Sequence, residues 1–484
     1  MMAVRTHIDP TLPPIDLEGV TADSRAVEQG FLFAALPGTA VDGRRFIGDA
    51  IRRGATAILA PPGTDLPADQ AGIVLVTDDD PRRRLALIAA DYYGAQPETV
   101  TAVTGTNGKT SVAFFTRHLW SATGRKAASL GTLGILADGL PEEPGLTTPE
   151  PVMLHAQLAD IAEAGISHLA LEASSHGLAQ RRLDGVKIAA AGFTNLSRDH
   201  LDYHASFEEY FAAKARLFDI CVAEGGLAVI NADSDQAEAL SDIATRRNLT
   251  LIGYGASGRE FRVVARQPTP GGCELELEIL GQTAKVDLPL IGSYQTANAL
   301  CALGLAMADT ALSADTLIDG LASLPSVPGR LEKVGISARG GAVFVDYAHT
   351  PDALETVLKA LREHTAGTLG VVFGCGGDRD PGKRPQMGRA AATLADWAIV
   401  TDDNPRTEDP ASIRAEALAA CPDAREIGDR RQAIEAAIEA LQDGDVLVLA
   451  GKGHEPYQIV GEQTLPFDDR DVARETLAAS GGTA

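Results

Sequence analysis

Short apolar runs alternate with segments of helical periodicity along most of this chain. Between about residues 16 and 95, three apolar runs and one helical pattern occur, at 31–36, 55–60, 73–76 and 82–93. This alternation predicts a small α/β domain. Gly94 and Pro97 then interrupt the pattern, so residues 94–98 are predicted to be a linker.

Four further runs follow the linker and are apolar throughout, at 100–103, 168–172, 188–193 and 227–230. Continuous apolar runs are typical of parallel strands that helices cover on both faces. Residues 293–307, rich in Ala and Leu with Asn298 among them, predict a helix. Ligand-binding residues are expected at the carboxyl ends of such strands.

A second break lies at Pro325 to Arg330, and the alternation resumes with runs at 343–345, 369–373, 397–400 and 446–449. The predicted fold class is therefore α/β with three domains. They are a small N-terminal α/β domain (1–97), a larger central domain with a parallel-rich sheet (98–327) and a C-terminal Rossmann-like domain (328–484).

Composition and charge limit the binding partners and the cellular compartment that we expect for this protein. The net charge of −24 over 484 residues argues against nucleic acid or anionic lipid as the main partner, whereas a small anionic substrate held by a few cations remains compatible. No run approaches 18 apolar residues, and prolines break the first 14 residues, so we expect a cytoplasmic protein without membrane insertion. The five cysteines show no C-x-x-C spacing, which fits a reducing compartment.

Residues 101–111 read as a β-branched strand, a glycine turn and a helix that starts near Thr110. Gly105 and Gly108 let backbone N–H groups approach an anion, Lys109 adds a positive charge, and the Thr110 hydroxyl is placed to bind Mg²⁺. The match to G-x-x-x-x-G-K-[ST] is imperfect, because Val103 stands where the first glycine belongs. The alternative is an ordinary strand-to-helix turn, but the pattern favours a P-loop-type ATPase domain.

Other polar residues follow the predicted central strands, and each has a plainer interpretation. Glu172 ends a strand and could bind Mg²⁺ or assist a helix N-cap. His200 could be a second ligand, although a lone histidine is more often a structural hydrogen-bonding group. Lys214 lies on an amphipathic helix, where a single lysine is usually a surface residue. In the first domain, 23–25 and 37–39 could take a ligand, but each is typical of a turn.

Three polar segments follow strands of the last domain, and parallel strands would bring them to one edge of the sheet. They contain Arg379, Asn404, Arg406 and Glu455. Such a set would suit a zwitterion, because a guanidinium binds a carboxylate bidentately and a carboxylate binds an ammonium. The alternative is turn chemistry with surface ion pairs.

Seven motifs occur in order along the chain: Thr104-Gly-Thr-Asn-Gly-Lys-Thr110, Glu172-Ala-Ser-Ser-His-Gly177, Thr194-Asn-Leu-Ser-Arg-Asp-His-Leu-Asp-Tyr-His204, Asp346-Tyr-Ala-His-Thr-Pro351, Gly374-Cys-Gly-Gly-Asp-Arg-Asp380, Asp403-Asn-Pro-Arg406 and Gly451-Lys-Gly-His-Glu455. Together they resemble the Mur ligase family of peptidoglycan synthesis, over essentially the whole chain. Asp403-Asn-Pro-Arg406 resembles the tetrapeptide of the members that add meso-2,6-diaminopimelate, which differs in the lysine-adding members.

The resemblance implies an ADP-forming amide synthesis. The γ-carboxylate of the D-glutamyl residue in UDP-N-acetylmuramoyl-L-alanyl-D-glutamate would attack ATP, and an amine of meso-diaminopimelate would displace phosphate from the acyl phosphate. Domain closure would exclude water. The alternatives are a related ligase that adds L-lysine or another amino acid, and a nucleotide-switch ATPase without a small-molecule product. We expect a monomer.

The resemblance also implies roles for single residues. ATP would contact Gly105, Thr106, Asn107, Gly108, Lys109, Thr110, Ser111, Asn298, Arg330 and Asp346, and Mg²⁺ would be held by Thr110, Glu172, His200 and Lys214 as a carbamate. Lys109, Glu172, His200 and Lys214 would be catalytic. The UDP-linked substrate would lie along Ser24, Thr39, Thr147, Thr148, Ser174, Gln180 and Arg182. Diaminopimelate would contact Arg379, Asp403, Asn404, Pro405, Arg406, Gly451 and Glu455.

At three places the chain departs from residues that are common in enterobacterial or other members of the family. Thr39-Ala-Val41 and Leu146 replace more polar residues, and Gln295 stands where an asparagine is frequent.

Overall fold

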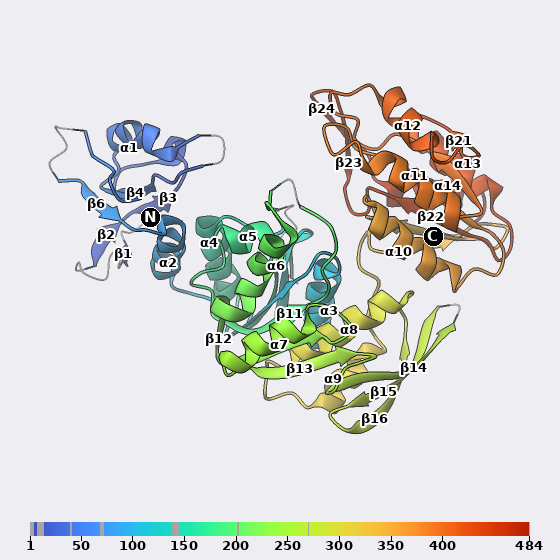
Figure 1. The fold of residues 1–484 in the computed structure, drawn as a ribbon, viewed down its shortest axis with the longest axis horizontal. Helices are drawn as coiled ribbons and strands as arrows, with labels where there is room; N and C mark the ends of the chain where they lie inside the picture. Colours follow the sequence, from blue (N-terminus) through green and yellow to red (C-terminus); the bar gives the residue numbers. More distant parts are fainter. Residues whose placement is uncertain are drawn as a thin grey trace. The chain divides into compact units, whose positions relative to one another are not determined.

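The computed structural model describes residues 4–6, 14–38, 41–67, 72–137, 139, 145–200, 203–269 and 271–483 (Figure 1). Its contacts divide the chain into two compact units. Unit 1 comprises Met1–Glu260 with Leu300–Leu317, and unit 2 comprises Phe261–Ala299 with Ile318–Ala484. Each unit is of the α/β class. Thr39, one of the predicted substrate contacts, lies outside the described residues.

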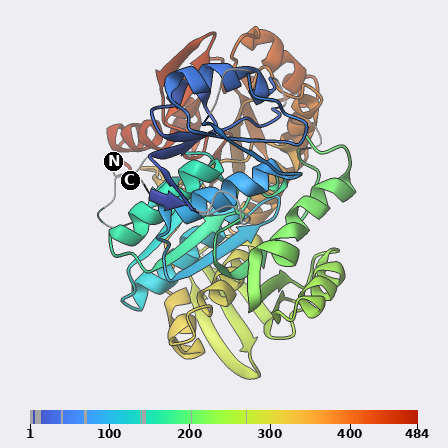
Figure 2. The ribbon, with the colours of Figure 1, turned by 90° about the vertical axis from the view of Figure 1, so that its left-hand side faces the viewer.

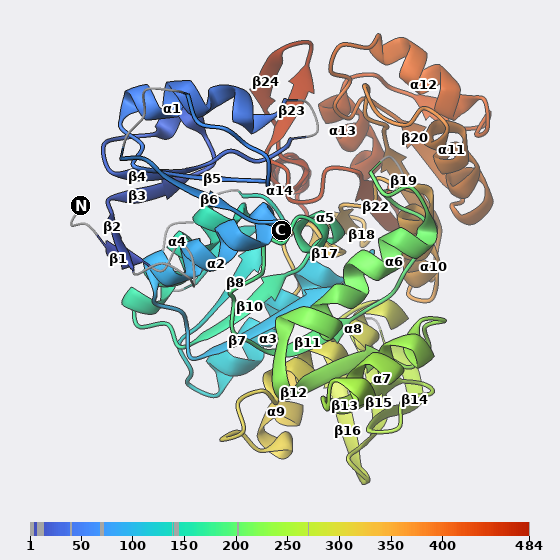
Figure 3. The same ribbon diagram turned by 60° about the vertical axis from the view of Figure 1, so that its left-hand side comes forward.

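Unit 1 begins with a four-stranded parallel sheet in the order β3-β4-β5-β6. Helix α2 packs on one face through Leu85 and Ile88, and α1 packs on the other through Ile47 and Ala50 (Figure 3). The elements of this part are β1 (Val4–Thr6), β2 (Ile15–Leu17), β3 (Gly19–Thr21), η1 (Ser24–Ala26), β4 (Phe31–Ala34), η2 (Gly43–Phe46), α1 (Ile47–Arg53), β5 (Ala57–Ala60), β6 (Val74–Thr77) and α2 (Pro81–Tyr93). The three predicted strands and the predicted helix are confirmed.

The larger part of unit 1 is a sheet in the order β13-β12-β11-β7-β10-β8-β9, parallel except for β9. Its strands are β7 (Thr99–Thr104), β8 (Ala127–Gly131), β9 (Gly134–Leu136), β10 (His168–Glu172), β11 (Ile188–Phe193), β12 (Val222–Asn231) and β13 (Thr250–Gly255). Its helices are α3 (Lys109–Ala122), α4 (Pro151–Glu163), α5 (Ser175–Ala179), α6 (Phe207–Arg216), η3 (Leu217–Cys221) and α7 (Ala237–Arg246). All residues of β10 are buried, as the continuous apolar run predicts.

Unit 2 contains an antiparallel meander of β14 (Phe261–Thr269), β15 (Gly272–Ile279) and β16 (Gln282–Leu288), drawn in yellow-green in Figure 2. The predicted elements do not include these strands. The signal was present, because the apolar residues of β15 alternate with Glu274, Glu276 and Glu278, which is the period of a strand with one buried face.

The main sheet of unit 2 has the order β17-β18-β22-β19-β20-β21 and is parallel except for β17. Separate cores lie on its two faces. The strands are β17 (Glu332–Ile336), β18 (Ala342–Asp346), β19 (Leu369–Phe373), β20 (Trp397–Val400), β21 (Arg425–Glu426) and β22 (Val446–Ala450), followed by the hairpin β23 (Tyr457–Val460) and β24 (Gln463–Pro466). The four strands predicted here are confirmed.

The remaining helices are α8 (Ser293–Ala306), α9 (Ala314–Leu321), α10 (Pro351–Arg362), α11 (Lys383–Leu394), α12 (Pro410–Leu418), α13 (Arg430–Ala440) and α14 (Asp469–Ala479). The predicted helix at 293–307 corresponds to α8. Among the described residues, no helix combines the length and the apolar character needed to cross a bilayer.

Candidate active site

The turn between β7 and α3 has the geometry of a phosphate cradle. Gly105 has φ +149°, and a Cβ there would lie 1.9 Å from Thr194 Oγ1, so a side chain cannot be accommodated. Gly108 caps α3 with φ 90°. Lys109 Nζ donates to the carbonyl oxygens of Gly105, at 3.0 Å, and Thr106, at 2.9 Å. The backbone can therefore approach an anion with an ammonium beside it.

Thr194 and Asn195, which directly follow β11, form hydrogen bonds to this cradle. Thr194 Oγ1 donates to Asn107 O at 2.6 Å, and Asn107 N donates to Asn195 Oδ1 at 3.0 Å. Thr106 N donates to Asn195 O at 2.9 Å. The motif that starts at Thr194 thus fixes the loop.

Glu172, at the end of β10, lies directly beside the first turn of α3. Its Oε2 accepts from Thr110 Oγ1 at 3.1 Å and from Thr132 Oγ1 at 3.2 Å, and its Oε1 accepts from Thr132 N at 2.8 Å. The cap of α5 is formed by Ser174, whose Oγ accepts from Gly177 N, so Glu172 is not the N-cap residue of the helix that follows it. A carboxylate next to a hydroxyl is the kind of oxygen pair that Mg²⁺ prefers.

Within the described chain, no group of three or more His, Cys, Asp or Glu side chains is arranged to hold a metal by itself.

His200 lies in a cluster of aromatic rings. It has φ 53°, its ring meets that of His176 edge-on with centroids 4.9 Å apart, and the ring of Tyr210 is 6.1 Å away. Its Nε2 is 3.5 Å from Asp199 Oδ2.

Lys214, on α6, is only 1% exposed, so its interpretation as a surface lysine is wrong. Its Nζ lies 4.5 Å from the centroid of the Tyr210 ring and donates to Gly105 O at 2.8 Å, the same carbonyl that accepts from Lys109. Burial, together with the charge of Lys109, holds the pKa of Lys214 well below its usual range. The environment of the cradle therefore disfavours the charged form of this lysine.

The predicted contacts of the UDP-linked substrate within 147–182 form one hydrogen-bonded network. Thr148 Oγ1 donates to Glu172 O at 2.8 Å, and Arg182 Nη1 donates to Thr148 O at 2.6 Å. Arg182 Nη2 also donates to Gln180 Oε1 at 2.8 Å. Two further bonds connect Thr147 with Thr132, at 3.0 Å, and Ser174 N with Thr148 Oγ1, at 2.9 Å.

Ser24 lies in η1, where the side chain of Asp23 caps the turn by accepting from Arg25 N at 2.9 Å. The interpretation of 23–25 as a turn is confirmed.

In unit 2, parallel strands bring the three predicted polar segments to one sheet edge. Residues 374–380 follow β19, residues 401–406 follow β20, and residues 451–455 follow β22. Asn404 Nδ2 donates to Glu455 Oε2 at 3.1 Å, and Arg406 Nη1 donates to Gly377 O at 2.8 Å. The three segments are thus in direct contact with one another.

Further residues complete this edge. Gly451 has φ +120°, and a Cβ there would lie 2.5 Å from Asp403 Oδ2, which explains why a glycine is needed. Pro405 is buried, whereas Arg379 is exposed. Burial raises the pKa of Glu455.

Asp346, at the end of β18, is buried. Its Oδ2 accepts from Leu331 N at 2.6 Å and its Oδ1 from Ala348 N at 2.8 Å. Burial raises its pKa to about 6, although the Arg330 charge opposes that shift. The Arg330 guanidinium lies 4.2 Å from the centroid of the Tyr347 ring. Asn298, on α8, donates from Nδ2 to Gln295 Oε1 at 2.9 Å.

Three residues of these sites were not predicted. Thr132 follows β8, a strand that the apolar runs did not identify, and Tyr210 lies four residues before Lys214 on the same face of α6. Lys452 is the second residue of the motif Gly451-Lys-Gly-His-Glu455. Its complete burial could not be predicted from the sequence of a polar loop.

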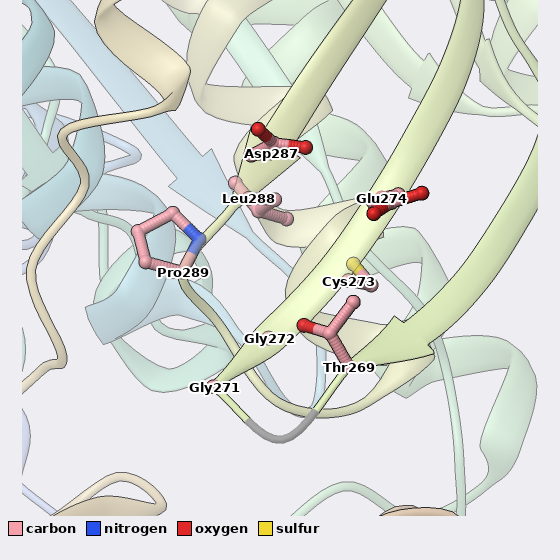
Figure 4. A pocket seen from close by; sticks show the side chains of 8 residues that line it. All are labelled: Thr269, Gly271, Gly272, Cys273, Glu274, Asp287, Leu288 and Pro289. Atoms are coloured by element: carbon pink, nitrogen blue, oxygen red, sulfur yellow. The ribbon is translucent and has the colours of Figure 1, made fainter.

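A pocket of about 290 Å³ opens on the meander and is lined by Thr269, Gly271, Gly272, Cys273, Glu274, Asp287, Leu288 and Pro289 (Figure 4). It contains none of the predicted site residues. Its lining has two carboxylates and no cationic side chain, which does not suit a phosphate.

Comparisons with known proteins match this chain to one family over nearly its whole length. Residues 16–93 match the model described as Mur ligase family, catalytic domain, residues 103–306 match the Mur ligase middle domain, and residues 329–453 match the Mur ligase, glutamate ligase domain. A UDP-N-acetylmuramoyl-L-alanyl-D-glutamate--2,6-diaminopimelate ligase of Caulobacter vibrioides is 53% identical over 472 residues, which cover 96% of both chains. The ligase of the same name from Brucella melitensis is 50% identical over 465 residues, covering 96% of this chain and 95% of that one.

A solved structure of a ligase with the same name superposes with a TM-score of 0.73 at 35% identity, over 99% of this chain and 100% of the other. The ADP complex of the MurF ligase from Thermotoga maritima has a TM-score of 0.60 at 21% identity, over 95% of this chain and 96% of that one, and shares the fold. The predicted three-domain α/β class and the predicted resemblance are confirmed: the chain belongs to the Mur ligase family.

Proposed function

We propose that this chain is an ATP-dependent ligase that adds meso-2,6-diaminopimelate to the D-glutamyl γ-carboxylate of UDP-N-acetylmuramoyl-L-alanyl-D-glutamate. The observation that carries the proposal is the 53% identity over 96% of both chains to a ligase named for these compounds. The two clusters of polar residues, one in each unit, supply the chemistry such a reaction needs.

The cradle serves the first half of the reaction. A carboxylate has no leaving group, so transfer of the γ-phosphoryl group to it makes it reactive toward an amine. Backbone N–H groups of 105–111 and the ammonium of Lys109 hold the phosphates and offset the negative charge that builds up as two anions approach. Thr110, Glu172 and His200 would hold Mg²⁺, which would supply Lewis-acid stabilisation of negative charge on the phosphates.

Lys214 takes part as a carbamate. Its neutral amine is the form that can attack CO₂, forming an N–C bond and losing a proton, and the lowered pKa of this group favours that form. The product would be an anion whose oxygens could bind Mg²⁺. Tyr210, whose hydroxyl is 3.0 Å from Thr106 Oγ1, holds the lysine over the cradle.

The sheet edge of unit 2 receives the amino acid. Diaminopimelate carries two carboxylates and two amino groups. The guanidinium groups of Arg379 and Arg406 bind its carboxylates, and Asp403 and Glu455 bind an ammonium. Asn404, Pro405 and Gly451 shape the site around them.

The finer assignments follow from the same proposal. ATP contacts Asn298, Arg330 and Asp346 in addition to the cradle. The UDP-linked substrate lies along Ser24, Thr39, Thr147, Thr148, Ser174, Gln180 and Arg182. The enzyme acts as a monomer in the cytoplasm, and its three domains span 1–97, 98–327 and 328–484.

An amino-acid panel tests the proposal. The purified chain is incubated with Mg²⁺, ATP, the UDP-linked dipeptide and single amino acids, and both ADP release and product mass are measured. We expect the tripeptide with meso-diaminopimelate. A product with L-lysine alone would assign the chain to a related ligase, and ADP release independent of both substrates would indicate a nucleotide switch.

A further inference from the structure

We propose that Lys452 is a positioning residue of the amino-acid site: its buried ammonium fixes the Asn404 carboxamide in the orientation that presents Nδ2 to Glu455. This inference rests on the proposed function and refines it, because it states how the chain prepares the carboxylate that receives an ammonium group of the substrate.

The partners of Asn404 allow only one orientation of its amide. Lys452 Nζ, at 3.2 Å, and Ile459 N, at 2.9 Å, both donate to Oδ1. On the other side, Nδ2 donates to Glu455 Oε2 at 3.1 Å. Rotating the amide by 180° would place NH₂ against two donors and a carbonyl oxygen against a carboxylate.

Lys452 is an unusual residue for such a position. Its side chain is fully buried, directly after β22 and between Gly451 and Gly453. Burial of an ammonium is unfavourable unless nearby groups compensate. Here Glu455 Oε2 lies 3.9 Å from Nζ, and the Tyr457 ring centroid lies 5.8 Å away. A shorter or apolar side chain would avoid the burial but could not hold the amide.

The fixed amide in turn orients Glu455. One carboxylate oxygen accepts from Asn404 Nδ2, and the other accepts from Tyr347 OH at 3.4 Å. With a donor on each oxygen, the carboxylate plane is held, and lone pairs of both oxygens remain for an ammonium group. Without Lys452, Oδ1 would keep only the donor from Ile459 N, and the orientation of the amide would be held less tightly.

The test is a double-mutant cycle on the full chain. Lys452→Met keeps the length of the side chain and removes its donor. We expect KM for diaminopimelate to rise about tenfold while KM for ATP stays within about twofold. In an Asn404→Ala background, adding Lys452→Met should change KM for diaminopimelate by less than about twofold, because there is no amide left to orient.

The cycle separates positioning from a merely structural role. Equal effects of Lys452→Met in both backgrounds, or a parallel rise in KM for ATP, would overturn the proposal. Lys452→Gln provides a second variant, since its amide retains a donor without charge. It should recover at least half of the loss, and it replaces Lys452→Met if the methionine variant is insoluble. A wild-type chain that makes no product with diaminopimelate would refute the proposed function instead, independently of the cycle.

Discussion

Two lysines donate to one carbonyl oxygen at the cradle, and this arrangement contributes to the lowered pKa of Lys214. Lys109 Nζ is 3.0 Å and Lys214 Nζ is 2.8 Å from Gly105 O. Burial is the larger cause of the lowered pKa of Lys214, and the charge of Lys109 adds to it.

Replacing Lys214 tests its role directly. We expect Lys214→Ala to lose activity by at least about a hundredfold, since the anionic Mg²⁺ ligand is lost, and to recover partly when formate or acetate is added. Product formation is measured with and without the added carboxylate. Lys187→Ala, at an exposed position of the same unit, is the control and should remain fully active. Full activity of Lys214→Ala would contradict the carbamate.

The raised pKa of Asp346 should make the free energy of unfolding depend on pH, with a sign that can be worked out. Its pKa is about 6 in the folded chain and 3.8 as the reference value, so the folded state binds the proton more tightly. Its contribution to stability is therefore present at low pH and is lost as pH rises through about 6. Between pH 7.5 and pH 5 this group alone should add about 1.4 kcal/mol to the free energy of unfolding.

Urea unfolding of the wild type and of Asp346→Asn at both pH values measures that contribution. We expect the wild type to gain stability relative to the variant on going from pH 7.5 to pH 5. An identical pH response of the two proteins would show that the Asp346 carboxyl is not perturbed by burial.

At the residue scale, the sequence predicted the strand, glycine turn and helix of the cradle, whereas spacing alone did not predict the burial of Lys214. Gly105, Gly108 and Lys109 stand in a motif that can be recognised from consecutive residues, although Thr194 and Asn195 also hold the loop. The burial of Lys214 depends on tertiary packing of α6. Its spacing did contain a signal, because Lys214 lies four residues after Tyr210 and so shares the buried face of the helix.

At the scale of elements, a buried ion pair joins α13 and α14 to the strand ends of unit 2. Arg430 and Asp469 side chains are both 0% exposed, and Arg430 Nη2 lies 2.6 Å from Asp469 Oδ2. Arg430 also donates to Ala450 O at 3.0 Å and to Asp402 O at 3.3 Å. One guanidinium thus ties the ends of β22 and β20, which carry the amino-acid site.

Two ion pairs join α13 and α14, one buried and one exposed, and their contributions to stability can be compared. Arg430→Met should lower the free energy of unfolding by about 3–5 kcal/mol, because it leaves Asp469 charged and unpaired in the interior. Arg431→Ala breaks the Arg431–Glu475 pair, which joins the same helices at exposed positions, and should cost less than about 1 kcal/mol. Urea unfolding measures both. Similar values for the two variants would contradict the assignment of stability to the buried pair.

Most of the parallel strands were predictable because continuous apolar runs are typical of strands covered on both faces, and the direction of the strands then specifies the edge where polar segments gather. The meander β14–β16 and the hairpin β23–β24 were not predicted. All four residues of β24 are exposed, so no buried face imposes a period on its sequence. The hairpin is nevertheless important, since Ile459 N binds Asn404 and Ile459 O accepts from Arg406 N at 3.1 Å.

At the scale of the whole molecule, the phosphate cradle and the proposed amino-acid site lie in different units. The cradle, Glu172 and Lys214 belong to unit 1, and the Asp403 to Arg406 segment belongs to unit 2. Formation of the acyl phosphate requires ATP and the acid but no amino acid. A substitution at the amino-acid site should therefore leave the first half of the reaction intact.

Arg406→Ala tests this separation. It removes a guanidinium expected to bind a carboxylate of diaminopimelate, so KM for diaminopimelate should rise at least about tenfold while KM for ATP changes by less than about twofold. With ATP and the UDP-linked dipeptide alone, hydroxylamine should trap the acyl phosphate as a hydroxamate to the same extent in Arg406→Ala and in the wild type. Lys109→Met should lose both the hydroxamate and the tripeptide, because the phosphates are no longer neutralised. Loss of the hydroxamate in Arg406→Ala would mean that the amino-acid site is already needed for phosphoryl transfer. The proposed separation of the two steps would then be wrong.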